Sequence, residues 1–581
     1  MNDRFIFIIA FLFSFSSLNA QHQWARQSAG QGVDSRDIAT DLRGNVYAFG
    51  DFTGTVMWGT HTLVQDNTVN TEGPSFLTRY DTDGNAVWVR GIKGKSSNNG
   101  NAVATDAAGN VYVCGEYDQT NSFSNLDFGN GITLDGNPSS SLFLAKADSF
   151  GTFHWAERIL ATDAPGSQRI TAKDILVSGA DIYITGEVLQ AVTVGGNSYN
   201  TTNGDKAQLF IAKYDTSGNF QWFKHTNRVG DFGTAGGSCI YAGKNGNIYV
   251  TGTHNKFSVT WDSDTFGVYP QTSNAHLFIG CFDSDGNMLW HRWAATSSNG
   301  AQQPHPSGVD SDGNITTTIR VMGSTVLADT TFFETGTERF LLRLDAQGNR
   351  VFLKPMYTFS GFSGPVTQIH ALYTQGDGIT FVTGAHVLNP IIIGNDTLPA
   401  DPGGISQWNF FAAYDNQGNP IDARLWADEY LASFNEFEIA GICGDPQGNV
   451  FVTGKMEGAA KIGNDTLDQM FNMFLVKTRP DGFFNLSTDI YDELTPGRSF
   501  RIFPNPAAES VWLEYEPQKA ESIQIRMENL QGQIIWREEK LFSPGAIRQQ
   551  ITLPMISSGI YIVRFQHGNT VLGVEKIIIS R

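Results

Sequence analysis

One pattern recurs seven times along this chain, at a spacing of roughly 64 to 71 residues. In most copies a Gly-Asn turn leads into an apolar strand with an aromatic residue and a closing glycine. The copies are Gly44–Gly50, Gly109–Gly115, Ala180–Gly186, Gly246–Gly252, Gly313–Ile319, Gly376–Gly384 and Gly448–Gly454, the fifth and sixth being weaker. A period of this length indicates one supersecondary unit repeated around or along an axis.

A second pattern lies between these copies, in which an apolar strand, an Asp-x-x-Gly-Asn turn and a strand with Trp follow one another. Its copies are Phe76–Trp88, Phe143–Trp155, Phe210–Trp222, Phe278–Trp290, Phe340–Phe352, Phe410–Asp422 and Phe474–Phe484. Two short strands around a glycine-containing loop are typical of a β-hairpin. The glycine supplies the positive φ that residues with a Cβ resist.

Together the two patterns give four strands per repeat, so the sequence predicts an all-β, seven-bladed β-propeller with four-stranded blades. Small residues such as Ala39 and Ala104 lie in the strand before the first pattern, as the crowded innermost strand requires. The last repeat has a poor fourth strand, whereas Trp24 lies in an isolated fourth-strand pattern near the start. We expect residues 21–27 to complete the last blade, which removes an open edge. The alternative is that residues 483–487 supply this strand.

The composition and the N-terminus limit the class of protein. With 581 residues the chain is too long for one ordinary domain. Its formal net charge of −19 argues against a nucleic-acid partner, because phosphate binding needs a basic face. Residues 1–20 are typical of a secretory signal peptide, with Arg4, the apolar run Phe5–Phe15 and Ala20 at the cleavage point. We expect no transmembrane segment in the mature chain.

The four cysteines, Cys114, Cys239, Cys281 and Cys443, lie in different repeats and lack metal-ligand spacing. They are expected to be buried free thiols, neither a disulfide framework nor a zinc site. The eleven histidines are scattered, and no catalytic motif is present. The sequence therefore predicts no cofactor, no catalytic residue and no enzyme activity.

The repeat ends near Thr488, and the chain changes character. We predict a propeller over residues 21–487, a linker over 488–497 with Pro496 and Gly497, and a small C-terminal domain over 498–581. Alternating strands separated by Gly, Pro and Asn turns favour an Ig-like β-sandwich for the last part.

Several motifs of this last part occur in a fixed order. They are Pro504-Asn505-Pro506, Leu530-Gln531-Gly532, Leu553 with Ser558-Gly559-Ile560-Tyr561, and the basic-apolar end Lys576–Arg581. In these motifs the region resembles the type A C-terminal sorting domain of type IX secretion, and the repeats resemble seven-bladed propeller repeats that often precede it. The resemblance implies a protein of a Gram-negative bacterium that crosses the inner membrane by its signal peptide. The type IX machinery then takes it across the outer membrane, for release or for attachment to surface lipopolysaccharide.

Two sets of residues are weighed as binding sites. The Asp-x-Asp-Gly-Asn runs at Asp81, Asp283 and Asp310 resemble the start of a calcium loop, but the later ligands of an EF-hand are missing. Capping of a tight turn by the Asp side chain is the favoured interpretation, with a structural calcium ion at one turn as the alternative. Trp88, Trp155, Trp222 and Trp290 share one register, which indicates packing between blades. Candidate ligand-binding residues are the tryptophans outside that register, Trp293, Trp408 and Trp426, because they lie in or beside connections.

The lengths of the loops indicate which face of the disc binds partners. The short turns between strands one and two and between strands three and four must lie on one face of the disc. The long, variable connections lie on the other face, some with an inserted hairpin such as Val56–Leu63 or Ile391–Leu398. We expect partners on this second face and at the mouth of the central channel.

The leading hypothesis is a non-catalytic platform, secreted or attached to the surface, that binds a glycan, a matrix component or another surface protein. One alternative is a secreted hydrolase or lyase that acts on carbohydrate or peptide, because propellers also host enzymes. The other is a structural component of the cell surface, for which we expect self-association and no soluble ligand.

Overall fold

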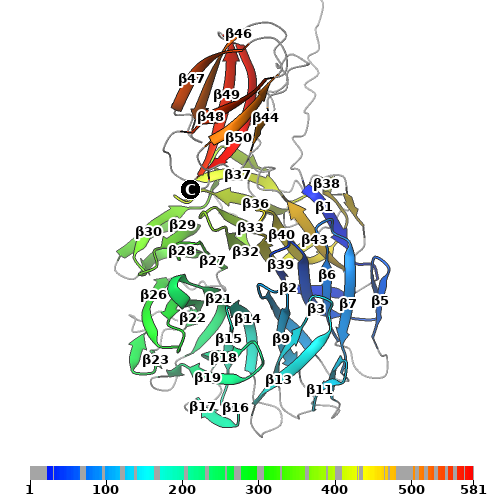
Figure 1. Ribbon diagram of the computed structural model, residues 1–581. Coiled ribbons are helices and arrows are strands. Elements are labelled where there is room, and N and C mark those ends of the chain that lie inside the picture. The colour runs from blue at the N-terminus through cyan, green and yellow to red at the C-terminus, as the bar shows by residue number, and fades with distance from the viewer. Residues whose placement is uncertain are drawn as a thin grey trace, which may run out of the picture. The chain divides into compact units, whose positions relative to one another are not determined.

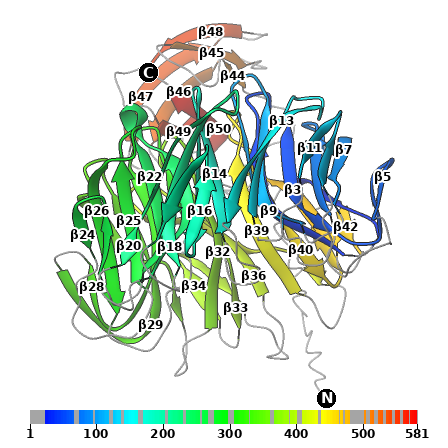
Figure 2. The same ribbon diagram turned by 90° about the horizontal axis from the view of Figure 1, so that it is seen from below.

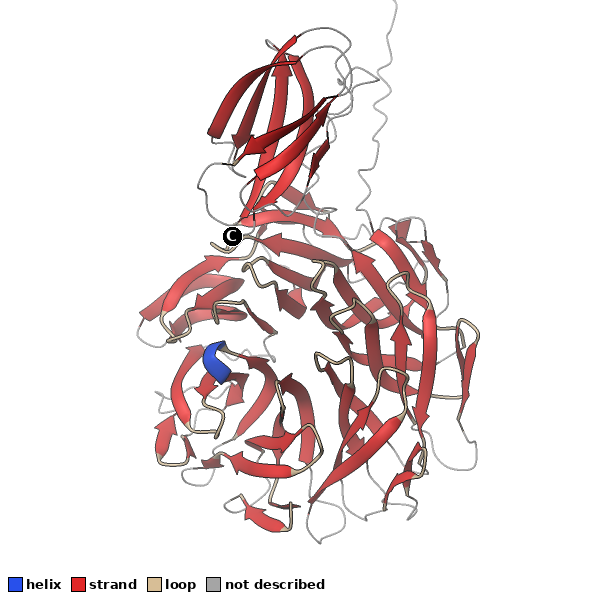
Figure 3. Cartoon of the chain, viewed as in Figure 1, coloured by secondary structure: helices blue, strands red, loops and turns tan. Residues whose placement is uncertain are grey.

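The structure is a computed structural model in which nearly every regular element is a β-strand; the exception among the described residues is the short 3-10 helix η1 (Lys244–Gly246) (Figure 3). The chain divides into two compact units, residues 1–484 and 485–581. The structure describes residues 22–579 with gaps at 31, 66–73, 95–97, 118–124, 136–140, 162–169, 202–206, 229–233, 255–257, 267–275, 297–305, 328–329, 360–365, 388–389, 400–407, 428, 431–435, 463–464, 469–471, 479–500, 504–509, 516–520, 529–533, 543–546, 554–558 and 568–569.

Each repeat of the first unit folds into an antiparallel four-stranded blade, as the two sequence patterns predict. The second and third strands are buried along almost their whole length, because both of their faces pack against neighbouring blades. The first three blades are β2 (Val33–Thr40), β3 (Val46–Phe52), β6 (Ser75–Tyr80), β7 (Ala86–Ile92); β8 (Asn98–Thr105), β9 (Val111–Tyr117), β12 (Ser141–Ala147), β13 (Phe153–Ala161); and β14 (Ile170–Ser178), β15 (Asp181–Val188), β18 (Gln208–Asp215), β19 (Phe220–His225).

The later blades follow the same order of strands, with two departures. The fifth blade has a short first strand and two long central strands, and the seventh takes its fourth strand from the N-terminus. These blades are β21 (Ala235–Ala242), β22 (Ile248–His254), β25 (His276–Phe282), β26 (Met288–Thr296); β27 (Ser307–Val309), β28 (Ile315–Leu327), β29 (Thr330–Leu344), β30 (Arg350–Pro355); β32 (Val366–Thr374), β33 (Thr380–Val387), β36 (Trp408–Tyr414), β37 (Pro420–Leu425); and β39 (Glu436–Gly444), β40 (Val450–Glu457), β43 (Asn472–Thr478), β1 (His22–Gln27).

The blades close into a ring around one axis (Figures 1 and 2). The first strand of each blade lies beside the first strand of the next, and β39 lies beside β2, so these seven strands form an inner ring. Closure comes from β1, which pairs antiparallel with β43 as the outermost strand of the seventh blade. This confirms the predicted ring closure; the alternative strand at 483–487 lies outside the described residues.

A short hairpin stands between the second and third strands of each blade and reaches back to the preceding blade. It pairs with the segment that follows that blade's fourth strand, through β20 (Asn227–Arg228), β31 (Thr358–Phe359), β38 (Glu429–Tyr430), the ends of β13 and β26, and the bridges Ala29–Met57 and Lys93–Asp127. In the fifth blade the hairpin is the extension of β28 and β29. The other six are β4 (Thr55–Trp58) with β5 (His61–Val64), β10 (Leu126–Gly129) with β11 (Ile132–Leu134), β16 (Ala191–Val194) with β17 (Asn197–Asn200), β23 (Val259–Trp261) with β24 (Asp264–Phe266), β34 (Ile391–Ile393) with β35 (Asp396–Leu398), and β41 (Ala460–Ile462) with β42 (Asp465–Leu467).

The ring therefore has two different ends. We call the end with the turns that join strands one to two and three to four the turn end, and the end with the inserted hairpins the hairpin end. The hairpins whose side chains are described bury one face: Val56 and Trp58 of β4 are at most 1% exposed, and Val259 and Trp261 of β23 are equally buried. The hairpins thus belong to the core and continue it beyond the blades.

The second unit is a β-sandwich with its own core. One sheet has the order β44 (Arg501–Phe503), β45 (Ser510–Tyr515), β48 (Ile547–Thr552), and the other has the order β47 (Ile534–Phe542), β46 (Glu521–Glu528), β49 (Gly559–His567), β50 (Thr570–Ile579). Both sheets contribute alternating apolar side chains to one cluster, including Val511, Leu513, Ile525, Phe565 and Ile577. Two sheets around one core agree with the predicted sandwich.

Candidate functional site

At the turn end, the aspartates of the Asp-x-x-Gly turns bind their own turns. The Oδ1 atom of Asp81 accepts hydrogen bonds from the backbone N–H groups of Asp83 and Asn85, at 3.0 and 2.8 Å, and Oδ2 accepts one from the Asn85 side chain at 3.0 Å. Asp283 and Asp310 repeat this arrangement. Turn capping by Asp is thereby confirmed. Asp215 accepts the corresponding hydrogen bonds from Ser217 and Asn219, and these bonds, first that of the Asn219 side chain, hold the pKa of Asp215 below its usual range.

The fourth strands of the seventh, first, third and fourth blades each hold the turn of the next blade by an indole hydrogen bond, a contact that we call the clasp. The indole Nε1 of Trp88 donates to the carbonyl of Ser149 at 3.0 Å, and Arg90 Nε donates to the carbonyl of Gly151 at 3.1 Å. Trp24, Trp222 and Trp290 make the same bond to Thr82, Ser284 and Ala346. The predicted role of the in-register tryptophans in packing between blades is confirmed, and these turns are occupied by structural contacts.

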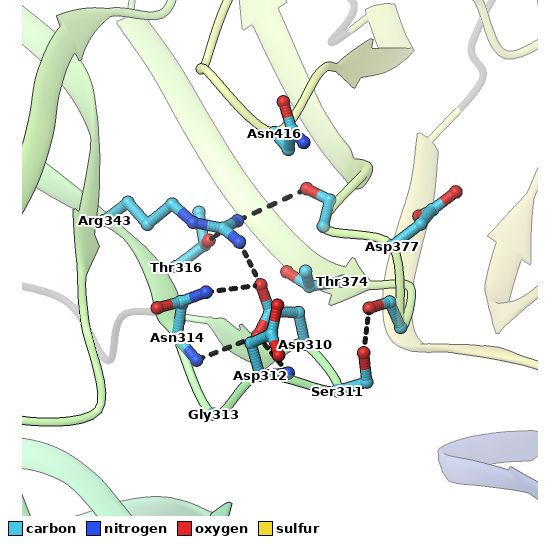
Figure 4. Close-up of polar contacts among 12 residues, drawn as sticks. Asp310, Ser311, Asp312, Gly313, Asn314, Thr316, Arg343, Thr374, Asp377 and Asn416 are labelled. Carbon is cyan, nitrogen blue, oxygen red and sulfur yellow. Dashed lines mark hydrogen bonds and ion pairs between the residues drawn. The ribbon is translucent and has the colours of Figure 1, made fainter. Parts of the chain in front are cut away.

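In the fifth blade, a buried ion pair stands where other blades have a hydrogen bond between a tyrosine and the turn aspartate. In the first two blades the tyrosines Tyr47 and Tyr112 hydrogen-bond the turn aspartates Asp41 and Asp106. The corresponding residue of the fifth blade is Thr316, and Arg343 from β29 reaches the turn aspartate Asp310 instead (Figure 4).

Arg343 also makes hydrogen bonds to other groups of the protein. Arg343 Nη1 donates to Thr316 Oγ1 at 3.2 Å and to the carbonyl of Gly378 at 3.3 Å. Both side chains of the pair are 4% exposed, and burial lowers the pKa of Arg343. A buried ion pair with satisfied hydrogen bonds holds the fifth and sixth blades together and offers no surface to a ligand.

The inner ring carries two carboxylates that bind the neighbouring blade. Asp37 on β2 accepts the backbone N–H of Val103 at 2.8 Å, and Asp174 on β14 accepts that of Ile240 at 2.8 Å. Burial raises the pKa of both carboxyls, and the charge of Asp37 raises the pKa of Asp174 further. They contribute to blade-to-blade contact and place two interacting acidic groups on the first and third blades.

A set of varied side chains occupies one position of the second strand in each blade, directly after the closing residue of the first sequence pattern and toward the hairpin end. The residues at this position, from the first blade to the seventh, are Asp51, Glu116, Glu187, Thr253, Arg320, Ala385 and Lys455. All except the buried Ala385 are partly exposed. The position is acidic in blades one to three and neutral or basic in blades four to seven, so the two halves of the ring differ in charge.

Asp51 is the most constrained member of this set. It accepts the Gly100 N–H at 2.7 Å, the Ser75 hydroxyl at 3.2 Å and the Arg36 Nε at 3.4 Å. Burial raises the pKa of Asp51 to about 7 despite these bonds. Glu116 accepts a hydrogen bond from the Asn101 side chain at 3.1 Å.

The three candidate tryptophans do not form one site. Trp293 lies inside β26 opposite Phe278, and Trp408 is the first residue of β36, opposite His386. Trp426 is fully buried and stacks on Phe411, with ring centroids 6.0 Å apart, so its indole faces protein rather than solvent. The ligand role of Trp293 and Trp408 stays a prediction, and that of Trp426 is not pursued.

The remaining residues singled out in the sequence are the cysteines and the sorting motif, and part of that motif lies outside the described residues. All four cysteines are free; Cys114 and Cys281 are buried, and Cys239 and Cys443 are half-buried. In the described part of the chain, no group of three or more His, Cys, Asp or Glu residues could hold a metal ion. Of the sorting motif, Tyr561 lies in the sandwich core, and Gly559 and Lys576 belong to β49 and β50. Pro504, Asn505, Pro506 and Gly532 lie outside the described residues.

Sequence reasoning missed the charged residues inside the repeats. Asp37, Asp51, Asp174 and Arg339 occupy strand positions at which other blades carry different residues. A position-by-position comparison of the seven repeats shows these departures, because the turns fix the register of each copy. The contacts that they make between blades become visible only in the folded ring.

Comparison with known proteins agrees with this architecture. Residues 501–580 match the family of secretion system C-terminal sorting domains. An uncharacterized WD repeat-containing protein of Acanthamoeba polyphaga mimivirus is 26% identical over 265 residues, which are 42% of this chain and 19% of that protein. The match thus spans about a fifth of the length of that relative.

Solved structures give only distant similarity. A fungal alcohol oxidase of the AA5 family, in complex with copper, is 11% identical with a TM-score of 0.35, over 96% of this chain and 99% of that one. A Dyadobacter fermentans protein of unknown function is 8% identical with a TM-score of 0.32, over 78% and 99% of the two chains. TM-scores this low carry no argument about function.

Within the described residues, no helix has the length and apolar character needed to cross a membrane. The sorting domain shows that the chain is exported, to the cell surface or beyond it, and engages the type IX secretion machinery. The repeated four-stranded sheets, together with the similarity to a WD repeat-containing protein, identify the exported part as a β-propeller. The chain is a β-propeller repeat protein that ends in a secretion system C-terminal sorting domain.

Proposed function

We propose that the propeller is a non-catalytic binding platform, delivered to the outer-membrane surface of a Gram-negative bacterium or released from it. Its partner is a glycan, a matrix component or another surface protein, bound at the hairpin end of the ring. No cofactor takes part. The signal peptide brings the chain to the periplasm, and the sorting domain addresses it to the type IX machinery.

The observation that carries this proposal is the difference between the two ends of the ring. At the turn end, the Asp and Gly of the turn recur from repeat to repeat. The polar groups of these turns hydrogen-bond within the turn or to the Trp and Arg side chains of the preceding blade. Toward the hairpin end, the residue of the second strand that follows the first sequence pattern changes from blade to blade and is partly exposed in six of the seven. A scaffold that is uniform where it is structural and varied where it is exposed supports recognition at the varied end.

The charges at this end favour a polar partner. Glu116 and Glu187 of the second and third blades stand at the position that carries Arg320 in the fifth. Separate acidic and basic parts of a surface determine the orientation and register in which a partner binds, and they contribute less to the affinity. A glycan with polar substituents or a protein surface of mixed charge fits this arrangement.

The test uses the mature chain, residues 21–581, incubated with a panel of polysaccharides and surface or matrix proteins. Retention and release of products are scored in the same samples. We expect retention without products, and weaker retention by the double variant E116Q/E187Q. D285N is the matched control, because Asp285 lies at the turn end and the change removes the same type of charge.

Three outcomes would contradict the proposal. Products that accumulate with time would make the propeller an enzyme. Self-association without any retained partner would favour a structural component of the surface. Equal loss of retention in E116Q/E187Q and D285N would show that the hairpin end has no special part in binding.

A further inference from the structure

Two arginines face each other on the long hairpin of the fifth blade. Arg320 on β28 and Arg339 on β29 are direct cross-strand partners in the antiparallel register. Side chains of such a pair project from the same face of the sheet, and like charges directly opposite each other destabilise it. The register therefore brings two positive charges together on one face of this hairpin.

Arg339 is also buried at a position that is apolar in four of the six other blades and uncharged in the remaining two, which carry Ser75 and Asn409. The residues at the start of the third strand are Leu142, Leu209, Leu277 and Met473 in blades two, three, four and seven. Arg339 is only 5% exposed, and among the described residues its Nε atom has no hydrogen-bond partner. A buried guanidinium nitrogen without a hydrogen-bond partner is costly, so a further acceptor is expected at this point.

A histidine of the next blade completes the cluster. His370 is the bulged residue of β32, on the inner ring beside the fifth blade, and is half-buried. Its Nδ1 atom likewise has no hydrogen-bond partner among the described residues. Burial and the charge of Arg339 lower the pKa of His370 to about 4, whereas burial lowers that of Arg339 only to about 10. At neutral pH the imidazole is therefore neutral and the guanidinium charged.

We propose that Arg339, together with Arg320 and His370, forms an oxyanion site between the fifth and sixth blades. Its ligand carries a sulfate, phosphate or carboxylate group, either as a free ion or as a substituent of a sugar. The planar guanidinium binds two oxygens of such a group at once, and the neutral imidazole donates one further hydrogen bond. The inference stands on these residues and holds whether or not the hairpin end binds a macromolecule.

The test compares thermal unfolding of the mature chain, residues 21–581, in sulfate, phosphate, glucuronate and chloride at equal ionic strength. We expect the oxyanions to raise the Tm of the wild-type protein by about 2 °C or more over chloride, because a ligand that binds only the folded state stabilises it. The variant R339L should lose this response. In chloride it should be at least as stable as the wild type, since Leu is the residue found here in three other blades.

The matched control is R36L, which makes the same change at an arginine that has carboxylate partners, Asp34 at 2.9 Å and Asp51 at 3.4 Å. It should keep the oxyanion response. Should R339L fail to fold, R320S gives a second test, with an expected rise of about tenfold or more in the Kd for sulfate by calorimetry.

The arms of the experiment also distinguish the source of the anion. A response to sulfate and phosphate alone supports a site for a free ion, and a response to glucuronate at lower concentration supports a sugar acid. No response of the wild type above chloride, or an unchanged response in both R339L and R320S, overturns the proposal.

Discussion

In several blades, the glycine of the turn between the third and fourth strands serves two purposes at one position. Gly151 has a φ of +79°, which favours a residue without a Cβ. A Cβ placed there would lie 2.9 Å from the indole of Trp88, which packs on the turn from the preceding blade. Gly84 stands in the same relation to Trp24, at 2.7 Å. The glycine thus makes the turn and also opens the space for the clasp between blades.

These two purposes can be separated by substitution. Gly129 also has a φ of +79°, but no atom lies within 4 Å of a Cβ built there. We expect G129A to lose about 1–2 kcal/mol from the left-handed backbone alone. G151A should lose about 1–3 kcal/mol more, because the indole must shift. Chemical denaturation of both variants measures the difference, and equal losses would show that the Trp88 contact does not constrain the turn.

Asp51 predicts a pH dependence of stability. Its folded-state pKa of about 7 lies above the usual value of 3.8, so the folded protein holds this proton more tightly than the unfolded chain. The stability that the proton provides is complete below about pH 4 and is lost as the pH rises through 7. D51N keeps an acceptor for the Gly100 N–H and carries no charge, so its Tm relative to the wild type should rise between pH 5 and 8.

The measurement is a thermal unfolding series of D51N, D34N and the wild type over this range. D34N is the control, because Asp34 contacts the same Arg36 at 2.9 Å. The Tm difference between D34N and the wild type should change less with pH. A Tm difference between D51N and the wild type that is constant from pH 5 to 8 would contradict the assignment.

Among the elements, the short strand β1 closes the ring between the seventh blade and the first. It joins residues separated by more than 400 positions: the Ala25 N–H donates to Asp465 Oδ2 at 2.7 Å, and Asn472 donates to the Gly30 carbonyl at 2.8 Å. Trp24 closes the clasp onto the first blade. Without β1 the seventh blade has an exposed edge on β43, and the first blade loses the indole that covers its turn.

Deletion of residues 21–27 should therefore lower the Tm of the propeller by several degrees and leave it open to aggregation along β43. Adding a synthetic peptide of residues 21–31 should restore the Tm in a concentration-dependent way, because the peptide binds only the folded state. A peptide with Trp24 replaced by Ala serves as the control. An unchanged Tm in the deleted chain would mean that β1 does not close the ring.

The elements also show what can be predicted from the sequence. The four strands of each blade, the turn capping and the in-register tryptophans are visible because they depend on residues close together in the chain. The pairing of each hairpin with the preceding blade is not visible, since β20 and β31 are too short to give a pattern. The roles of Asp37, Asp174 and Arg339 depend on neighbours in other blades, and Trp426 is buried by Phe411 and Phe474 rather than exposed on a loop.

At the scale of the whole molecule, the two units have separate hydrophobic cores. The sandwich core is built from residues of β45, β46, β49 and β50 with Leu553, Tyr561 and their neighbours, and contains no residue of the propeller. The propeller core is likewise made of its own blades and hairpins. Among the described residues, each unit therefore buries apolar side chains in a core of its own.

This independence predicts the effect of removing the sorting domain. A chain without residues 498–581 should remain in the periplasm while the propeller still folds, because none of its core is lost. Cell fractionation locates the truncated chain, and protease resistance of residues 21–487 reports folding. As a control, residues 488–581 fused to an unrelated periplasmic protein should carry that protein to the cell surface or the medium. A truncated propeller that still reached the surface would mean that the address lies elsewhere in the chain.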